Sequence, residues 1–259
     1  MRIRATVAAV SGALALSALA VPAAHADESV GDTKISNVVV NGGKSVVVGA
    51  TAAKKVTVTF TVTDNSGLAW AQAILFHGST IEKSDAGAIA DGNDGEAKCT
   101  KVNATKSNCT STYTLKPAYD IVNASAGTWK VWAVAVAKDD NLTQKDNVKS
   151  FQVQRASQLT VNASPEPVKK GKTITVTGKL SRANWETGKY AGYTGQSVKL
   201  QFRKKSSSTY TTVKTVKTNS KGELKTTVKA SADGYYRYSF AGTSTTPAVN
   251  AAGDFIDVK

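Results

Sequence analysis

Oxygen ligands suited to a metal ion are concentrated in one short segment of the chain. Asp91-Gly-Asn-Asp-Gly-Glu96 places three carboxylates and an amide in six residues, with glycines that permit a tight loop. Calcium prefers hard oxygen ligands of this kind. The spacing departs from an EF-hand loop, because Asp94 follows Asn93 directly and no glutamate stands in the bidentate position. The segment is interpreted either as a weak calcium site formed by Asp91, Asn93, Asp94 and Glu96 or, as we favour, as a solvated acidic turn.

The histidines give little support for catalysis. His77 is the single histidine after residue 26, so a Ser-His-Asp or Cys-His arrangement would have to be built around it. Neither a Gly-x-Ser-x-Gly elbow nor a His-Glu-x-x-His motif occurs. The sequence therefore indicates a protein that is not an enzyme and that needs no cofactor, calcium excepted.

Basic residues are concentrated in the second half of the chain. Residues 157–259 carry 17 basic and 6 acidic side chains, whereas residues 27–156 carry 14 and 13. Apolar and polar residues alternate in Val198–Arg203, which sends Lys199 and Arg203 to an outer face. Such a face attracts polyanions. The residues predicted to contact a polyanion are Lys199, Arg203, Lys204, Lys205, Lys214, Lys217 and Lys225.

A second interpretation of these lysines remains open. Exposed lysines on strands prevent edge-to-edge pairing and keep a protein soluble. No motif for nucleic-acid recognition is present, so a specific nucleic acid is not expected as the partner.

One loop in the basic half is rich in aromatic residues. Arg182–Tyr193 contains Trp185, Tyr190 and Tyr193 among glycines. Exposed rings on a long loop can stack on sugars, which makes these three residues candidates for glycan binding. The same rings could instead fold back and cap the core, and we favour that interpretation.

The first 26 residues have the pattern of a cleaved signal peptide. Arg2 and Arg4 precede an uncharged Ala- and Leu-rich stretch, and Ala24-His25-Ala26 is a small-x-small cleavage site. The protein is therefore predicted to be secreted and extracellular. Neither a Leu-Pro-x-Thr-Gly sorting motif nor a lipoprotein cysteine occurs, so any retention at the cell wall is expected to be non-covalent.

Export also bears on the two cysteines. Cys99 and Cys109 are predicted to form a disulfide, because the extracellular environment is oxidising. Closing a loop of this length stabilises the fold by about 2.5–3 kcal/mol in the chain-entropy model. A zinc site is disfavoured, because two sulfurs without a neighbouring histidine do not fill a tetrahedral shell.

The periodicity of apolar residues predicts strands along the whole mature chain. Lys55–Thr63 alternates valine or phenylalanine with threonine, as a half-buried strand does, and Trp129–Ala137 is typical of a central strand. About seven short strands with frequent turns recur in each half. The predicted fold is all-β, with two tandem immunoglobulin-like antiparallel β-sandwiches after the signal peptide. The shift in charge places the domains at residues 27–155 and 156–259.

The second half also resembles a known group of domains. It is similar to an immunoglobulin-like domain common in secreted actinobacterial proteins, especially those of Streptomyces, which are often labelled calcium-binding. The resemblance implies the fold and the extracellular location, and it implies little about activity. The segments that carry it are Asn162–Leu180, Val198–Arg203, Val216–Gly222, Ala232–Arg237 and Asp254–Lys259, and more loosely Asp64–Gly67 and Ala126–Trp129.

Together these features predict a secreted, non-catalytic binding or structural protein. Its basic domain is expected to associate with cell-wall polyanions, while the first domain presents loops to another extracellular protein. Two alternatives stay open: a calcium-binding protein that uses Asp91–Glu96, and an inhibitor of a secreted hydrolase.

Overall fold

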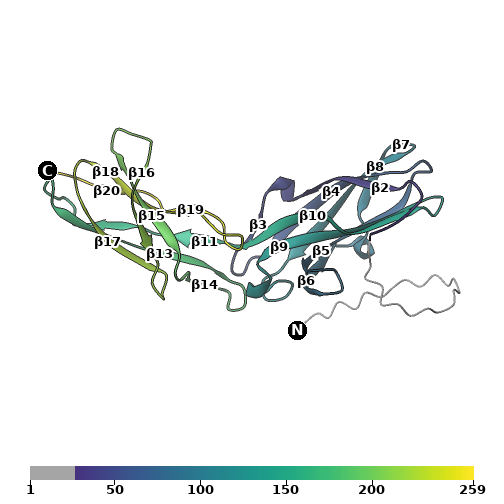
Figure 1. Ribbon diagram of the computed structural model, residues 1–259, viewed down its shortest axis with the longest axis horizontal. Helices are drawn as coiled ribbons and strands as arrows, with labels where there is room; N and C mark the ends of the chain where they lie inside the picture. The colour runs from purple at the N-terminus through teal and green to yellow at the C-terminus, as the bar shows by residue number, and fades with distance from the viewer. Residues whose placement is uncertain (1–26) are drawn as a thin grey trace. The chain divides into compact units, whose positions relative to one another are not determined.

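The computed structural model describes residues 27–259 as two compact units built almost entirely of strands. The N-terminal unit comprises the described residues up to Val46 together with Ala53–Val153. The C-terminal unit comprises Val47–Ala52 and Gln154–Lys259. In Figure 1 the strands of the C-terminal unit are coloured mainly green to yellow. The predicted signal peptide lies outside the described residues.

The N-terminal unit contains two antiparallel sheets. One has the order β2-β4-β8-β7, and the other has the order β1-β10-β9-β5-β6. The first sheet consists of β2 (Lys34–Val40), β4 (Lys54–Thr63), β8 (Lys106–Leu115) and β7 (Lys98–Asn103). The second consists of β1 (Glu28–Val30), β10 (Leu142–Arg155), β9 (Gly127–Ala137), β5 (Leu68–Gly78) and β6 (Ser84–Ile89). A further short strand is β3 (Val46–Val48), and single 3-10 turns are η1 (Asn41–Gly43), η2 (Asn93–Gly95) and η3 (Asn123–Ser125).

Alternation in the sequence explains how these strands pack. In β4, Val56 and Val58 are buried, whereas Thr57 and Thr59 are exposed. Such a pattern arises because successive side chains of a strand point to opposite faces. Strand β9 lies between β10 and β5, as its apolar run predicts. The hydroxyl of Tyr113 on β8 donates to the carbonyl oxygen of Ala73 on β5 at 2.7 Å, which links the two sheets.

The C-terminal unit also pairs two antiparallel sheets. In the first, β13 is flanked by β11 and β12 and also pairs with β14 and β17. The second has the order β16-β15-β18-β19, and β20 also pairs with β18. The first sheet consists of β11 (Ser157–Leu159), β12 (Asn162–Ser164), β13 (Thr173–Asn184), β14 (Lys189–Gly192) and β17 (Glu223–Lys229). The second consists of β15 (Ser197–Lys204), β16 (Thr211–Lys217), β18 (Gly234–Phe240), β19 (Val249–Asn250) and β20 (Asp254–Ile256).

The core of this unit lies between its sheets. Ile174 and Val176 on β13 pack in one apolar cluster with Leu200 on β15 and Tyr238 on β18. The Tyr238 hydroxyl donates to the carbonyl oxygen of Val176 at 3.0 Å and so joins the sheets, as Tyr113 does in the N-terminal unit. Burial raises the pKa of Tyr238 to about 12, because the phenolate would lose its hydration.

Both units follow the immunoglobulin-like strand plan. In the N-terminal unit, β2-β4-β8-β7 corresponds to strands A, B, E and D, and β10-β9-β5-β6 to G, F, C and C′. In the C-terminal unit, β12, β13 and β17 correspond to A, B and E, and β16, β15, β18 and β20 to C′, C, F and G. The predicted tandem β-sandwich fold is confirmed.

The predicted disulfide is confirmed as well. Cys99 on β7 and Cys109 on β8 are directly opposite each other in the antiparallel ladder, and their sulfurs are bonded. Among residues 27–259, no helix has the length and hydrophobicity that crossing a bilayer requires.

Candidate functional site

The acidic segment 91–96 forms a turn that is hydrogen-bonded to strand β8. Asp91 uses its carboxylate to accept hydrogen bonds from the backbone nitrogen and the hydroxyl of Thr114, at 3.2 and 2.6 Å. Asn93 and Asp94 both adopt positive φ angles in the turn η2. Within residues 27–259, no three His, Cys, Asp or Glu side chains are grouped so that they could hold a metal ion. The predicted ligand set of Asp91, Asn93, Asp94 and Glu96 is thus not brought together, because the first carboxylate serves to pin the turn to β8.

The glycan-stacking prediction is wrong for Trp185. Its side chain is only 1% exposed, and the indole nitrogen donates to the carbonyl oxygen of Val48 at 3.3 Å. The Tyr193 ring is half-buried against Phe240 at 5.8 Å, and the guanidinium of Arg182 covers it at 3.9 Å. Tyr190 is 37% exposed. The loop folds back because β14 pairs with β13, so the interpretation as a core cap is correct for Trp185.

The predicted polyanion-binding residues do not share one face. Lys199 and Arg203 lie on β15, and Lys214 and Lys217 lie on the neighbouring β16. Lys225 lies on β17, which pairs with β13 in the opposite sheet. The prediction of a single face formed by all seven residues is therefore wrong, because the chain crosses to the other sheet between β16 and β17. Lys204 and Lys205 follow Arg203 at the end of β15.

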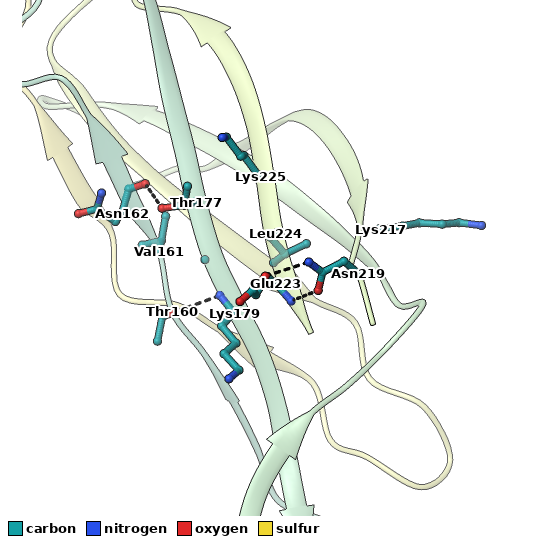
Figure 2. Close-up of a pocket in the computed structure, with 11 residues that line it drawn as sticks. Thr160, Val161, Asn162, Thr177, Lys179, Lys217, Asn219, Glu223, Leu224 and Lys225 are labelled. Carbon is teal, nitrogen blue, oxygen red and sulfur yellow. Dashed lines mark hydrogen bonds between the residues drawn. The ribbon is translucent and has the colours of Figure 1, made fainter. Parts of the chain in front are cut away.

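A groove of about 690 Å³ lies on the β13 side of the C-terminal unit (Figure 2). Lys179, Lys217 and Lys225 line it, and in Figure 2 their side chains extend in three different directions. Glu223 also lines the groove, and its carboxylate accepts a hydrogen bond from the amide of Asn219 at 2.9 Å. These cations do not converge on one point, and a carboxylate lies among them, so the groove is a poor site for an anion.

A more ordered cationic surface lies on the outer face of the opposite sheet. The register pairs Gln201 on β15 with Arg237 on β18, and Arg203 with Tyr235. Because Leu200, Tyr236 and Tyr238 are buried, their neighbours in each strand point outward. We define the arginine–aromatic face as Lys199, Gln201, Arg203, Lys205, Tyr210, Tyr235, Arg237 and Phe255.

Aromatic rings hold the cations of this face in place. The guanidinium carbon of Arg237 lies 3.8 Å from the ring centre of Tyr210, and that of Arg203 lies 5.4 Å from the same ring. Arg203 also covers the ring of Tyr235, at 3.9 Å. These distances are within the range of cation–π attraction. Both guanidinium groups are therefore gathered around one ring.

The row of rings continues toward β20. The ring centres of Tyr235 and Phe255 are 5.2 Å apart, and the ammonium of Lys205 lies 5.3 Å from the ring centre of Phe255. Tyr210 lies in the connection that leads into β16, and it packs closely on the backbone at residue 253. A Cβ atom built on Gly253 would contact the Tyr210 hydroxyl, so the absence of a side chain at residue 253 leaves room for this ring.

Hydrogen bonds fix the two guanidinium planes and leave donors available. The Nε of Arg237 donates to the Oε1 of Gln201 at 2.8 Å, and Nη1 of Arg203 donates to the carbonyl oxygen of Ser207 at 2.8 Å. A guanidinium has five N–H donors, so these bonds orient each group and use only part of its capacity. Such an arrangement is suited to bind oxyanions.

Carboxylates near the face are engaged elsewhere. Asp233 accepts a hydrogen bond from the backbone nitrogen of Val258 at 2.8 Å, and Asp254 accepts one from that of Ala163 at 2.6 Å. Among the described residues, no carboxylate oxygen lies within 4.0 Å of the cationic nitrogens of Arg203, Lys205 or Arg237. The positive charge of the face is thus not neutralised by the protein itself.

Sequence reasoning found only part of this face. Lys199, Arg203 and Lys205 were among the predicted residues, whereas Tyr210, Tyr235, Arg237 and Phe255 were not. The strict alternation of Gly234–Phe240 was available as a signal, because it sends Tyr235 and Arg237 to the same outer face. Nothing in the sequence around Tyr210 indicates that its loop folds over the sheet.

The match to a family model lies mainly in the N-terminal unit. The model of a family described as "Family of unknown function (DUF5707)" matches residues 43–135, which lie outside the arginine–aromatic face. No curated protein matches the chain.

Among solved structures, similar chains include the D00-D0 domain of Intimin, the Escherichia coli adhesin FdeC and a putative membrane anchored protein from Corynebacterium diphtheriae. Intimin D00-D0 is 18% identical with a TM-score of 0.28, and the match covers 86% of this chain and 99% of that one. FdeC is 17% identical with a TM-score of 0.34, covering 88% of this chain and 64% of that one. The Corynebacterium protein is 14% identical with a TM-score of 0.31, covering 88% and 59%. This chain thus spans less than two thirds of the last two, and at these scores the fold assignment rests on the sheet topology alone.

Proposed function

We propose that this chain is an exported, non-catalytic binding protein whose C-terminal unit attaches to anionic polymers outside the cell, foremost those of a Gram-positive cell wall. The leader-like residues 1–26 support export, and the charge of 17 basic against 6 acidic residues in 157–259 supports a polyanion as the partner.

The arginine–aromatic face is the observation that carries this proposal. Three of its cations, Arg203, Lys205 and Arg237, are held by rings or hydrogen bonds, and no carboxylate lies within 4.0 Å of the two arginines among the described residues. Lysines that served solubility alone would need no such support. A preordered cationic face also loses little side-chain entropy when an anion binds.

Binding of this kind has a predictable dependence on salt. Each anionic group that a lysine or arginine neutralises releases condensed counterions, so affinity falls as salt rises. With about four contacts, from Lys199, Arg203, Lys205 and Arg237, and a slope of roughly 0.7 per contact, affinity should fall about 50-fold between about 50 and 200 mM salt.

The test is a titration of the chain from residue 27 onward against isolated cell-wall sacculi, with their anionic polymers intact or extracted. We expect salt-dependent binding to intact sacculi and little binding to extracted ones. Retention that does not change with salt, or no retention at low salt, would refute the proposal.

A matched pair of charge variants locates the surface. Lys199→Glu with Lys205→Glu changes two exposed positions in the C-terminal unit, and Lys55→Glu with Lys101→Glu makes the same charge change in the N-terminal unit. We expect the first pair to lower affinity at least about tenfold and the control pair less than about twofold. At about 50–200 mM salt, charges far from the bound polymer are screened, so affinity depends mainly on the cations that contact it. Equal losses in both pairs would place the binding elsewhere.

The two alternatives lack a comparable observation. Among the described residues, no three His, Cys, Asp or Glu side chains are grouped to hold a metal ion, and no particular residues point to hydrolase inhibition. Calcium binding and hydrolase inhibition are therefore not proposed.

A further inference from the structure

We infer that the arginine–aromatic face binds flexible phosphodiester polymers of polyols, recognised through their phosphate groups and not through sugar rings or bases. This inference rests on the proposed function and names the class of polymer. It follows from two observations: the aromatic rings of the face are already in contact with other residues of the face, whereas the guanidinium groups still have hydrogen-bond donors for a ligand.

The aromatic rings are occupied. Tyr210 is contacted by Arg237 and Arg203, Tyr235 by Arg203 and Phe255, and Phe255 by Tyr235 and Lys205. Each ring thus has two partners within the face. Binding of a nucleic-acid strand relies on base stacking against free ring faces, and recognition of a pyranose commonly uses a free ring face in the same way. Either ligand would have to compete with these contacts for the rings.

The guanidinium groups are available. Arg203 and Arg237 each use one donor, on Ser207 and Gln201 respectively, and within residues 27–259 their remaining N–H groups make no further hydrogen bond to the protein. Both groups contact the ring of Tyr210, so their carbons are no farther apart than the sum of their two distances to its centre. Two planar forks gathered around one ring can donate to phosphates that lie near each other along a polymer.

The remaining cations extend the same chemistry along the sheet. Lys199 is two residues before Gln201 on β15, and Lys205 lies beyond Arg203 at the strand end. Anionic groups repeated along a flexible chain could meet these cations in succession. Because phosphates are the only charged groups of a flexible polyol chain, affinity should depend on how the arginines are placed to receive phosphate and not on charge alone.

The experiment compares three probes of equal charge number: a synthetic glycerol-phosphate oligomer, oligodeoxythymidine and an oligogalacturonate. Binding of each to the chain from residue 27 onward is measured by calorimetry at low salt. We expect the glycerol-phosphate oligomer to bind at least about tenfold more tightly than the other two. Tighter binding of either other probe would overturn the inference, and so would equal binding of all three.

Variants then test the arginines without changing the net charge. Arg203→Lys with Arg237→Lys keeps both charges but removes the planar forks, and it should lower affinity for the glycerol-phosphate oligomer about tenfold or more. Unchanged affinity in this double variant would overturn the inference while leaving a charge-driven attachment intact. Absence of binding to any probe and to sacculi would instead refute the proposed function.

Tyr210 provides a second, independent variant. It lies outside the strands, so Tyr210→Leu leaves the sandwich in place while removing the ring that both arginines contact. We expect about a three- to tenfold loss of affinity for the glycerol-phosphate oligomer. Tyr190→Leu, at a half-exposed position in another loop of the same unit, is the control and should have no effect. Far-UV circular dichroism and urea unfolding verify that each variant is folded. Equal affinities of the two tyrosine variants would show that the Tyr210 ring does not hold the arginines in a binding geometry.

Discussion

Replacing Tyr238 by phenylalanine should make the C-terminal unit less stable at neutral pH and more stable at high pH. The hydroxyl is buried and donates to the carbonyl oxygen of Val176 on the opposing sheet. At pH 7 the variant loses this hydrogen bond and leaves the carbonyl with one acceptor position unused. The expected cost is about 1 kcal/mol.

The sign reverses because the phenol titrates at different pH values in the two states. Burial raises the pKa of Tyr238 to about 12 in the folded protein, whereas it is about 10 in the unfolded chain. Stability that depends on the neutral phenol is fully present below pH ~10 and is lost as pH rises toward ~12. The wild-type protein should lose about 1.4 kcal/mol by pH ~11 and about 2.3 kcal/mol by pH ~12, and the variant avoids this loss. The two stabilities should therefore cross near pH ~11.

Urea unfolding of the chain from residue 27 onward, followed by tryptophan fluorescence at a series of pH values, measures this difference. Tyr113→Phe is the matched control, because Tyr113 makes the corresponding bond to Ala73 in the N-terminal unit and should shift only that unit's transition. Tyr236 is present in both proteins, so its own titration cancels from the comparison. A wild-type advantage that stays constant from pH 7 to pH ~11 would show that Tyr238 is not buried as described.

Two further predictions concern the N-terminal unit. Burial raises the pKa of Asp64, but hydrogen bonds from Ser66 and Thr33 outweigh it and hold the pKa below its usual value. The stability that the ionised Asp64 carboxylate contributes is present above pH ~4 and is lost as pH falls through the folded pKa. Asp64→Asn should therefore lower the unfolding free energy by about 1–3 kcal/mol at pH 7 and by less in acid. A loss that does not change with pH would contradict this. Replacing Cys99 and Cys109 by serine should lower the unfolding free energy, measured by urea unfolding, by about 2.5–3 kcal/mol. A change under about 0.5 kcal/mol would mean that the segment between the two cysteines is already ordered in the unfolded chain.

Local patterns in the sequence were sufficient for much of the fold. The alternation of Val56, Val58 and Phe60 with threonines predicted a half-buried strand, and the structure buries those three side chains. Outward positions for Lys199 and Arg203 followed from the same rule. These predictions succeed because the pleat fixes which side of a strand each side chain faces, whatever the strand pairs with.

Positions that depend on long-range pairing could not be predicted in this way. Alternation places Lys225 on the outer side of a strand, but only the topology assigns that strand to the sheet opposite Lys199. The aromatic loop offered two placements for Trp185, and pairing of β14 with β13 decided for burial. Each outcome depends on contacts between residues far apart in the chain, which a single sequence does not encode locally.

The sequence alone thus determined the strands, the disulfide, the uneven charge and the outward direction of individual cations. Only the tertiary structure decided which cations work together. Register brings Arg237 beside Gln201 and Tyr235 beside Arg203, and the connection before β16 brings the Tyr210 ring close to both arginines. The physical reason is that the direction of a side chain is a property of its own strand, whereas a binding surface is a property of the neighbours that the fold supplies.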